Sequence, residues 1–186
     1  MKEHAFLARK LDVAAFAREG ATLSGEWPAL EFERVAEFAA PEAPASTWPP
    51  VQWTLTGERR EPRGSEAQVW VSLEASAQVS LTCQRCLQPV REHLSMSRWY
   101  RFARTESEAA ELDAESDDDV LVLSRSLDTL ELVEDELLLS LPLVPRHEEC
   151  PQPLLPPASV VTLEEASEDE RPNPFAALAA LKKDKG

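Results

Sequence analysis

The strongest constraint on the fold of this chain is a period-two alternation of apolar and polar residues through its middle. The alternation runs through three segments, 51–59, 67–82 and 89–104. It is typical of β-strands with one buried and one exposed face. The stretch EPRGSE at 61–66 is a turn signal, and short connections favour antiparallel pairing. We therefore predict an antiparallel β-meander with one apolar face that requires a cover.

Three segments have the apolar spacing of amphipathic helices that could supply this cover. They lie at 11–19, 28–39 and 127–141, with Asp12 and Asp128 as N-caps of the first and last. The segment 40–50 contains four prolines and is predicted to be an extended linker, and 119–123 is predicted to be a short strand. The expected fold class is α+β, an antiparallel β-meander packed against a few helices.

The segments outside this core have compositions typical of solvated or disordered chain. We expect a flexible acidic loop at about 105–119, and a disordered linker at 151–172 that is rich first in proline and then in acidic residues. Residues 173–186 are predicted to form a short amphipathic helix, capped by Asn173 and with Pro174 in its first turn. We expect its apolar side to bind a partner or its own domain. Residues 1–150 are predicted to form a single domain. The candidate partner-binding residues are Asn173, Pro174, Phe175, Leu178 and Leu181.

Charge is distributed unevenly along the chain. The net charge is −15, and residues 105–170 hold 20 acidic and only 2 basic residues, whereas 57–104 hold 8 basic and 5 acidic residues. The overall charge opposes non-specific binding to nucleic acid, but the mildly basic middle does not. No apolar run approaches the roughly 20 residues of a membrane span, and the first 20 residues lack the apolar core of a signal peptide. We therefore expect a cytoplasmic protein without a membrane partner.

Four residues have the types and pairwise spacing of a zinc site. Cys83 and Cys86 form a C-x2-C pair between two predicted strands, and His147 and Cys150 form an H-x2-C pair after the last predicted helix. Zn²⁺ binds four such ligands in a tetrahedron, which leaves no open position and makes the site structural. Two alternatives remain: unliganded reduced thiols, and a redox pair, which would usually begin a helix rather than join two strands.

The sequence contains no recognisable catalytic set. It has only 5 glycines and no glycine-rich phosphate loop, and its three histidines are His4, His93 and His147. We therefore expect no enzyme activity and no small-molecule substrate.

The chain resembles the YceD family of bacterial large ribosomal RNA subunit accumulation proteins. The similar stretches are VSLTCQRCLQPV at 79–90, ELVEDELLLSLPLVPRHEEC at 131–150 and RPNPFAALAALKK at 171–183. The resemblance implies a non-catalytic cytoplasmic factor that supports synthesis, processing or stability of 23S rRNA and large-subunit assembly. It also implies metal and nucleic-acid binding. The residues that match the family motifs are Cys83, Arg85, Cys86, Glu134, Asp135, Glu136, His147, Cys150, Asn173, Pro174 and Phe175.

The leading functional hypothesis is that the basic middle segment binds 23S rRNA or its precursor. Arginines interleaved with aromatic residues can contact phosphates and stack on unpaired bases. Period two places Arg91 and Arg101 on one face of the strand and Arg98 and Arg104 on the other. The alternative is a protein-interaction module whose acidic segment and terminal helix recruit basic large-subunit ribosomal or processing proteins. The candidate RNA-binding residues are Arg85, Arg91, Arg98, Trp99, Arg101 and Arg104.

Overall fold

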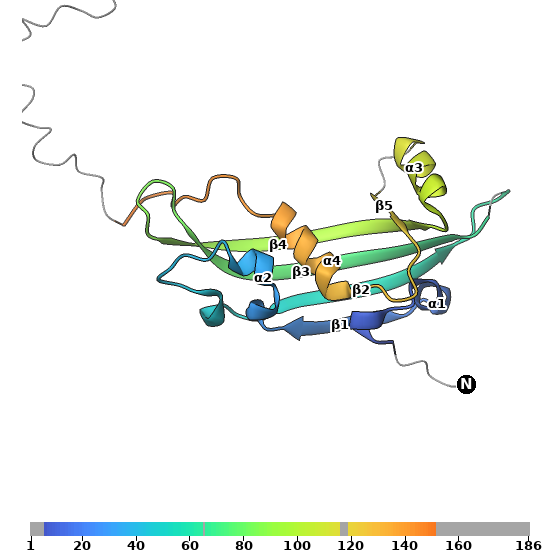
Figure 1. Cartoon of the computed structure of the whole chain (residues 1–186), viewed down its shortest axis with the longest axis horizontal. Helices are drawn as coiled ribbons and strands as arrows, with labels where there is room; N and C mark the ends of the chain where they lie inside the picture. The colour runs from blue at the N-terminus through green and yellow to red at the C-terminus, as the bar shows by residue number, and fades with distance from the viewer. Residues whose placement is uncertain (1–5, 65, 116–118, 152–186) are drawn as a thin grey trace, which may run out of the picture. The chain divides into compact units, whose positions relative to one another are not determined.

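The computed structural model contains a five-stranded sheet in the order β1-β2-β3-β4-β5 (Figure 1). It describes residues 6–64, 66–115 and 119–151. The first four strands pair antiparallel as a meander, and the fifth pairs parallel with β4. The strands are β1 (Thr22–Trp27), β2 (Val51–Arg60), β3 (Gln68–Thr82), β4 (Pro89–Ala103) and β5 (Asp119–Val122).

In the described part of the chain, four α-helices and three 3₁₀ turns accompany the sheet, which confirms the α+β class. Among the described residues, no helix combines the length and apolar character needed to cross a membrane. The helices are α1 (Val13–Glu19), α2 (Glu33–Ala36), α3 (Glu106–Glu115) and α4 (Thr129–Leu139), and the turns are η1 (Ala8–Lys10), η2 (Ala29–Glu31) and η3 (Ala45–Thr47).

One face of the sheet is buried beneath helices. Odd-numbered residues of β2 and β3 point to this face, and Leu55, Val71 and Leu73 are fully buried in a core that includes Val133 and Leu137 of α4. Helix α1 packs so closely on β2 that a Cβ at Gly57 would lie 2.8 Å from the Cα of Ala17. Glycine at position 57 therefore permits the close approach of helix and strand.

The other face, which we term the open face, carries the even-numbered residues of β2 and β3 and the odd-numbered residues of β4. The register aligns Thr54 with Glu74, and Glu74 with Ser97, across three neighbouring strands. Glu74 and Ser97 are exposed, and Thr54 is partly exposed. The described helices thus leave a polar sheet surface accessible to solvent.

The predicted N-caps and long strands agree with the structure. Asp12 accepts a hydrogen bond from the backbone N–H of Ala15 at 3.0 Å, and Asp128 accepts one from Leu130 at 2.9 Å. The three alternating segments become β2, β3 and β4 within one or two residues of their predicted bounds.

Besides β1, which the sequence analysis did not predict, three segments differ from the sequence predictions. The acidic stretch expected to be a loop contains α3, which packs on β5 and the end of β4, so tertiary contact stabilises a sequence with few apolar residues. The helix expected at 28–39 is divided into η2 and α2. The proline-rich segment 40–50 includes η3, and its Trp48 is buried with its ring N–H donating to the carbonyl of Ala43.

The chain divides into two units between Cys150 and Pro151. The disordered linker predicted at 151–172 lies outside the described residues except for Pro151. The helix predicted at 173–186, with its partner-binding residues Asn173, Pro174, Phe175, Leu178 and Leu181, lies entirely outside them.

Candidate metal centre and open sheet face

The first ligand pair lies in a tight turn between β3 and β4. Cys83 donates its backbone N–H to the carbonyl of Gln88 at 3.0 Å and accepts a hydrogen bond from the N–H of Leu87 at 2.9 Å. Leu87 has a φ of +61°, in the left-handed region that favours glycine. This left-handed residue closes the turn that carries Cys83 and Cys86.

The second pair lies in the loop that follows α4. This loop runs from the helix to the β3–β4 turn (Figure 1), and the N–H of Gln84 donates to the carbonyl of Pro145 at 2.9 Å. This hydrogen bond anchors the loop against the turn just before His147. The β3–β4 turn and the loop after α4, about 60 residues apart in sequence, are therefore in contact, as the zinc prediction requires.

The four predicted ligand residues form a compact cluster. One donor atom from each lies within 4.8 Å of the others. The Sγ atoms of Cys83 and Cys150 are 4.0 Å apart, and Sγ of Cys86 is 3.4 Å from Nδ1 of His147. Ligands in a tetrahedron around zinc, with bonds of roughly 2.0–2.3 Å, would be about 3.5–3.8 Å apart. The donor set and its spacing therefore fit a tetrahedral metal ion.

His147 is oriented by its second ring nitrogen. Nε2 lies 3.1 Å from the backbone carbonyl of Pro89, at the start of β4. A carbonyl oxygen only accepts, so Nε2 must be the protonated nitrogen, and Nδ1 is left with a free lone pair facing Cys86. This arrangement is typical of a metal-bound histidine held by an outer hydrogen bond.

Arg85 is exposed, and its guanidinium links the two pairs by hydrogen bonds. Its Nε donates to Sγ of Cys150 at 3.0 Å, and one Nη donates to the carbonyls of His147 and Glu148, each at 3.1 Å. The hydrogen bond to Cys150 raises the pKa of the guanidinium. A positive charge beside three sulfurs offsets the excess negative charge that three thiolates would bring to a divalent cation.

The two cysteines of the turn have opposite pKa shifts. Burial raises the pKa of the Cys83 thiol, but the backbone N–H groups of Cys86, His147 and Arg85 outweigh it and lower the value to about 5. Burial also raises the pKa of Cys86, and the neighbouring sulfurs of Cys150 and Cys83 raise it further. The geometry thus stabilises at least one thiolate, the form that binds metal.

The acidic residues of α4 hold this helix against its neighbours. Glu134 is buried and accepts hydrogen bonds from the backbone N–H and Nε of Arg34, each at 2.8 Å, and Asp135 pairs with the same guanidinium. Glu136 accepts one hydrogen bond from the hydroxyl of Tyr100 at 2.5 Å and one from Arg98 at 3.0 Å. Burial and the contact with Glu136 raise the pKa of Tyr100 far above its usual range. These contacts fix the helix from which the His147 loop departs.

The six predicted RNA-binding residues do not form one patch. Arg98 faces the helical layer, bound to Glu136 and Asp119, and Arg104 pairs with Glu66 at 2.9 Å. Arg85 belongs to the metal cluster, as described above. Arg91, Trp99 and Arg101 remain on the open face. Period-two geometry explains this division between faces.

Sequence reasoning missed two residues that complete a cluster on the open face. The guanidinium of Arg60 lies 4.1 Å from the ring centroid of Trp70 and 4.6 Å from that of Trp99. The guanidinium of Arg101 lies 6.0 Å from the Trp70 ring. We term Arg60, Trp70, Trp99 and Arg101 the Arg–Trp cluster. Its signal was present in the alternation, because Trp70 is a large aromatic residue at a position where its neighbours on the same face are polar.

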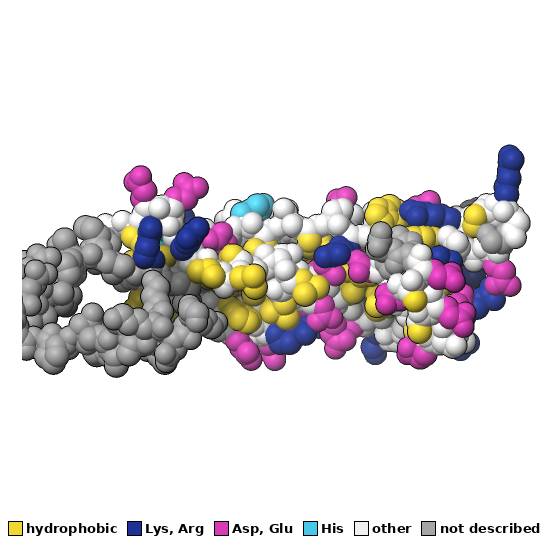
Figure 2. Space-filling view, turned by 90° about the horizontal axis from the view of Figure 1, so that it is seen from above, with side chains coloured by type: hydrophobic (Ala, Val, Ile, Leu, Met, Phe, Trp, Pro, Cys, Tyr) yellow, Lys and Arg dark blue, Asp and Glu magenta, His cyan; other side chains and the backbone are white. Residues whose placement is uncertain are grey.

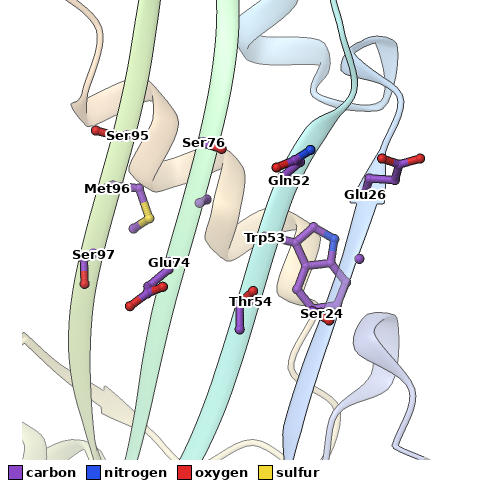
Figure 3. Close-up of a pocket in the computed structure, with 12 residues that line it drawn as sticks. Ser24, Glu26, Gln52, Trp53, Thr54, Glu74, Ser76, Ser95, Met96 and Ser97 are labelled. Carbon is purple, nitrogen blue, oxygen red and sulfur yellow. The ribbon is translucent and has the colours of Figure 1, made fainter.

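A hollow of about 840 Å³ occupies the centre of the sheet. Figure 3 shows its lining residues along β1–β4. By register, the polar side chains among them belong to the open face, whereas Trp53 and Met96 belong to the helical side. The polar lining residues are Ser24, Glu26, Gln52, Thr54, Glu74, Ser76, Ser95 and Ser97.

Comparison with known proteins identifies the family. Residues 71–182, more than half of the chain, match the family model described as large ribosomal RNA subunit accumulation protein YceD. The large ribosomal RNA subunit accumulation protein YceD of Haemophilus influenzae is 36% identical over 106 residues, which cover 56% of this chain and 60% of that protein. This chain therefore aligns with less than two thirds of that relative. No solved structure matches. The matched residues span the β3–β4 turn, α4 and all four cluster residues, and the chain therefore belongs to the YceD family.

Proposed function

We propose that this protein supports the accumulation of 23S rRNA during large-subunit assembly, as a non-catalytic factor in the cytoplasm. The observation that carries the proposal is the family match over 71–182, which includes the Cys/His cluster. The name of the Haemophilus influenzae relative supports the same role. The RNA partner would be 23S rRNA or its precursor.

We further propose that the Cys/His cluster holds a structural Zn²⁺. Cys83, Cys86, His147 and Cys150 would be its ligands, and Arg85 and the Pro89 carbonyl would support them from outside. The ion would supply cross-linking energy between the β3–β4 turn and the loop after α4. Three cysteines and one histidine fill four positions, so such a site leaves no place for a substrate.

Direct contact with RNA would involve the basic residues of the open face. Arg91, Trp99 and Arg101 are the members of the predicted set that point there. Arg85, Arg98 and Arg104 make protein contacts away from this face but are exposed, and they would be secondary RNA contacts.

Deletion of the gene tests the proposed role. We expect the ratio of 23S to 16S rRNA to fall, and a plasmid copy of the wild-type gene to restore it. A Cys83→Ser variant, which removes one proposed ligand, should restore it poorly. An unchanged 23S to 16S ratio in the deletion strain would contradict the proposal.

The alternative of a protein-interaction module is supported by the charge of α3. This ten-residue helix carries Glu106, Glu108, Glu111, Asp113 and Glu115 and no basic residue in its last turn. A carboxylate-rich helix could bind a basic large-subunit ribosomal protein, with an indirect effect on rRNA. Neutralising three of these glutamates to glutamine should then release a protein partner in affinity purification without changing affinity for RNA.

A further inference from the structure

The Arg–Trp cluster lies on the open face, at the end of the sheet where β2 leads into β3. We propose that it binds an unpaired base of single-stranded RNA, and that the strand continues along β4 toward Arg91. The inference rests on the proposed function, which supplies RNA as the partner. It adds the location of the site, the class of RNA and the mode of contact.

The cluster is held in place before any ligand arrives. Glu58 accepts a hydrogen bond from Arg60 at 3.0 Å, which fixes the guanidinium between two indole rings. Trp70 is only 5% exposed, and its ring N–H donates to Gln68 at 3.0 Å. Trp99, in contrast, is 41% exposed. Arg60 and Trp70 thus form a fixed support, and Trp99 offers an accessible indole. Such an arrangement is suited to stacking on a base at low entropic cost.

The charges on the open face favour a path along β4. Arg91 and Arg101 lie on the same face of this strand, ten residues and therefore roughly 33 Å apart. His93, Ser95 and Ser97 lie between them on that face, so hydroxyl and imidazole groups are available to phosphates and 2′-hydroxyls. The path thus has a cation at each end and hydrogen-bonding groups between them.

Acidic groups limit where the phosphates can run. Glu26 lies on β1 and Glu74 on β3, in register with Ser97 of β4, so phosphates would avoid the β1–β3 side of the face and pass Glu74 on the far side of β4. Helix α3, which packs on β5 and the end of β4, would repel phosphates beyond the cluster. Both effects confine the RNA backbone to β4 between Arg101 and Arg91.

The mixed surface charge favours single strands over duplexes. Figure 2, which views the molecule from one edge of the sheet, shows acidic and basic side chains interspersed there. On the open face, Glu58 and Glu74 likewise accompany Arg60, Arg91 and Arg101. Non-specific attraction to duplex phosphates is therefore weak, and affinity must come from stacking on an unpaired base. A duplex has no free base face to offer to Trp99.

Binding of a labelled RNA to the full-length, zinc-loaded protein tests the inference. The probe is an unstructured oligoribonucleotide of about 10 nucleotides, followed by fluorescence anisotropy, with its duplex as comparison. We expect Trp99→Ala to weaken single-strand binding roughly 5- to 100-fold and Trp99→Phe to retain most of it, because phenylalanine keeps a stacking ring. Arg18→Ala, which removes a charge from α1 on the helical side, is the matched control and should bind like wild type.

Three results would overturn the inference. They are wild-type affinity in Trp99→Ala, equal affinity for single strand and duplex, and no binding by the wild-type protein. Zinc content and the thermal transition of each variant establish that it is folded, and Arg101→Gln provides a second variant should Trp99→Ala not fold. The proposed function fails separately: only an unchanged 23S to 16S ratio after gene deletion contradicts it. If a folded Trp99→Ala variant restored the 23S to 16S ratio fully, the Arg–Trp cluster would not be required for the proposed function, which would itself still stand.

Discussion

Leu87 is the one non-glycine residue with a positive φ in the described part of the chain. Its φ of +61° is left-handed and its side chain is 67% exposed, so it carries the strain without much compensating burial. We expect Leu87→Gly to raise the free energy of unfolding by about 0.5–1 kcal/mol, since glycine adopts this region without a steric penalty. Leu87→Ala is the control and should change stability little. Urea denaturation of the zinc-loaded protein measures both, and a glycine variant less stable than the alanine variant would contradict the argument.

Arg85 is the residue on which the two halves of the Cys/His cluster depend most directly. Its planar fork contacts one sulfur and two carbonyls, a set that the single ammonium of lysine cannot reproduce. We expect Arg85→Ala to weaken zinc affinity by roughly 10- to 100-fold, and Arg85→Lys to recover only part of this loss. Competition with a chromophoric chelator measures the affinity.

Arg146 provides the matched control for this measurement. Arg146 lies in the loop after α4, carries the same charge and is exposed like Arg85, but its side chain makes no hydrogen bond or ion pair with the described residues. If Arg146→Ala weakened zinc affinity as much as Arg85→Ala, the effect would come from net charge and not from the three contacts.

The four residues of the Cys/His cluster were predictable because sulfur and imidazole pairs at short spacing are rare by chance. The role of Arg85 was not predictable, because an arginine within a basic segment is equally consistent with an RNA contact. Its true partners, Cys150 and the two carbonyls, lie more than 60 residues away in sequence. Only the folded structure supplies that proximity.

Among the elements, α4 is held to β4 by a polar triad centred on the buried Glu136. The Tyr100 hydroxyl and Arg98 on β4 both donate to Glu136 on the helix. We expect Tyr100→Phe to lower the free energy of unfolding by about 1.5–3 kcal/mol, because the phenol donates to a buried, charged carboxylate. The same substitution should cost less when Glu136 is already glutamine, since hydrogen bonds to neutral acceptors are weaker. Equal costs in the two backgrounds, measured by thermal or urea unfolding, would mean that the hydroxyl does not act through Glu136.

The strands whose buried and exposed residues alternate regularly were the ones that the sequence predicted best. β2 and β3 alternate almost without interruption, so their bounds follow from the sequence. β1 was missed because it is an edge strand with few buried side chains and a glycine at its centre. The β4–β5 pair is parallel and requires the α3 crossover, and nothing in the four residues of β5 specifies its partner.

At the scale of the whole molecule, the Cys/His cluster joins the loop after α4 to the β3–β4 turn. His147 and Cys150 lie directly before the division between the two units, and their partners lie in the β3–β4 turn. The described contacts between this loop and the turn are otherwise few: the Gln84–Pro145 backbone bond, the Arg85 bonds and the His147–Pro89 bond. The sheet and α4, in contrast, share an extensive apolar core.

Removal of zinc should therefore loosen one end of the molecule before the rest. We expect a strong chelator to lower the thermal transition, because metal binding contributes to folding when its ligands are distant in sequence. We also expect hydrogen exchange to accelerate first in residues 83–88 and 142–150, while the centres of β2 and β3 stay protected, since their hydrogen bonds and core contacts do not involve the ligands. Cys83→Ser should reproduce both effects without chelator. An unchanged transition, or uniform loss of protection across the sheet, would contradict a local structural role for the metal.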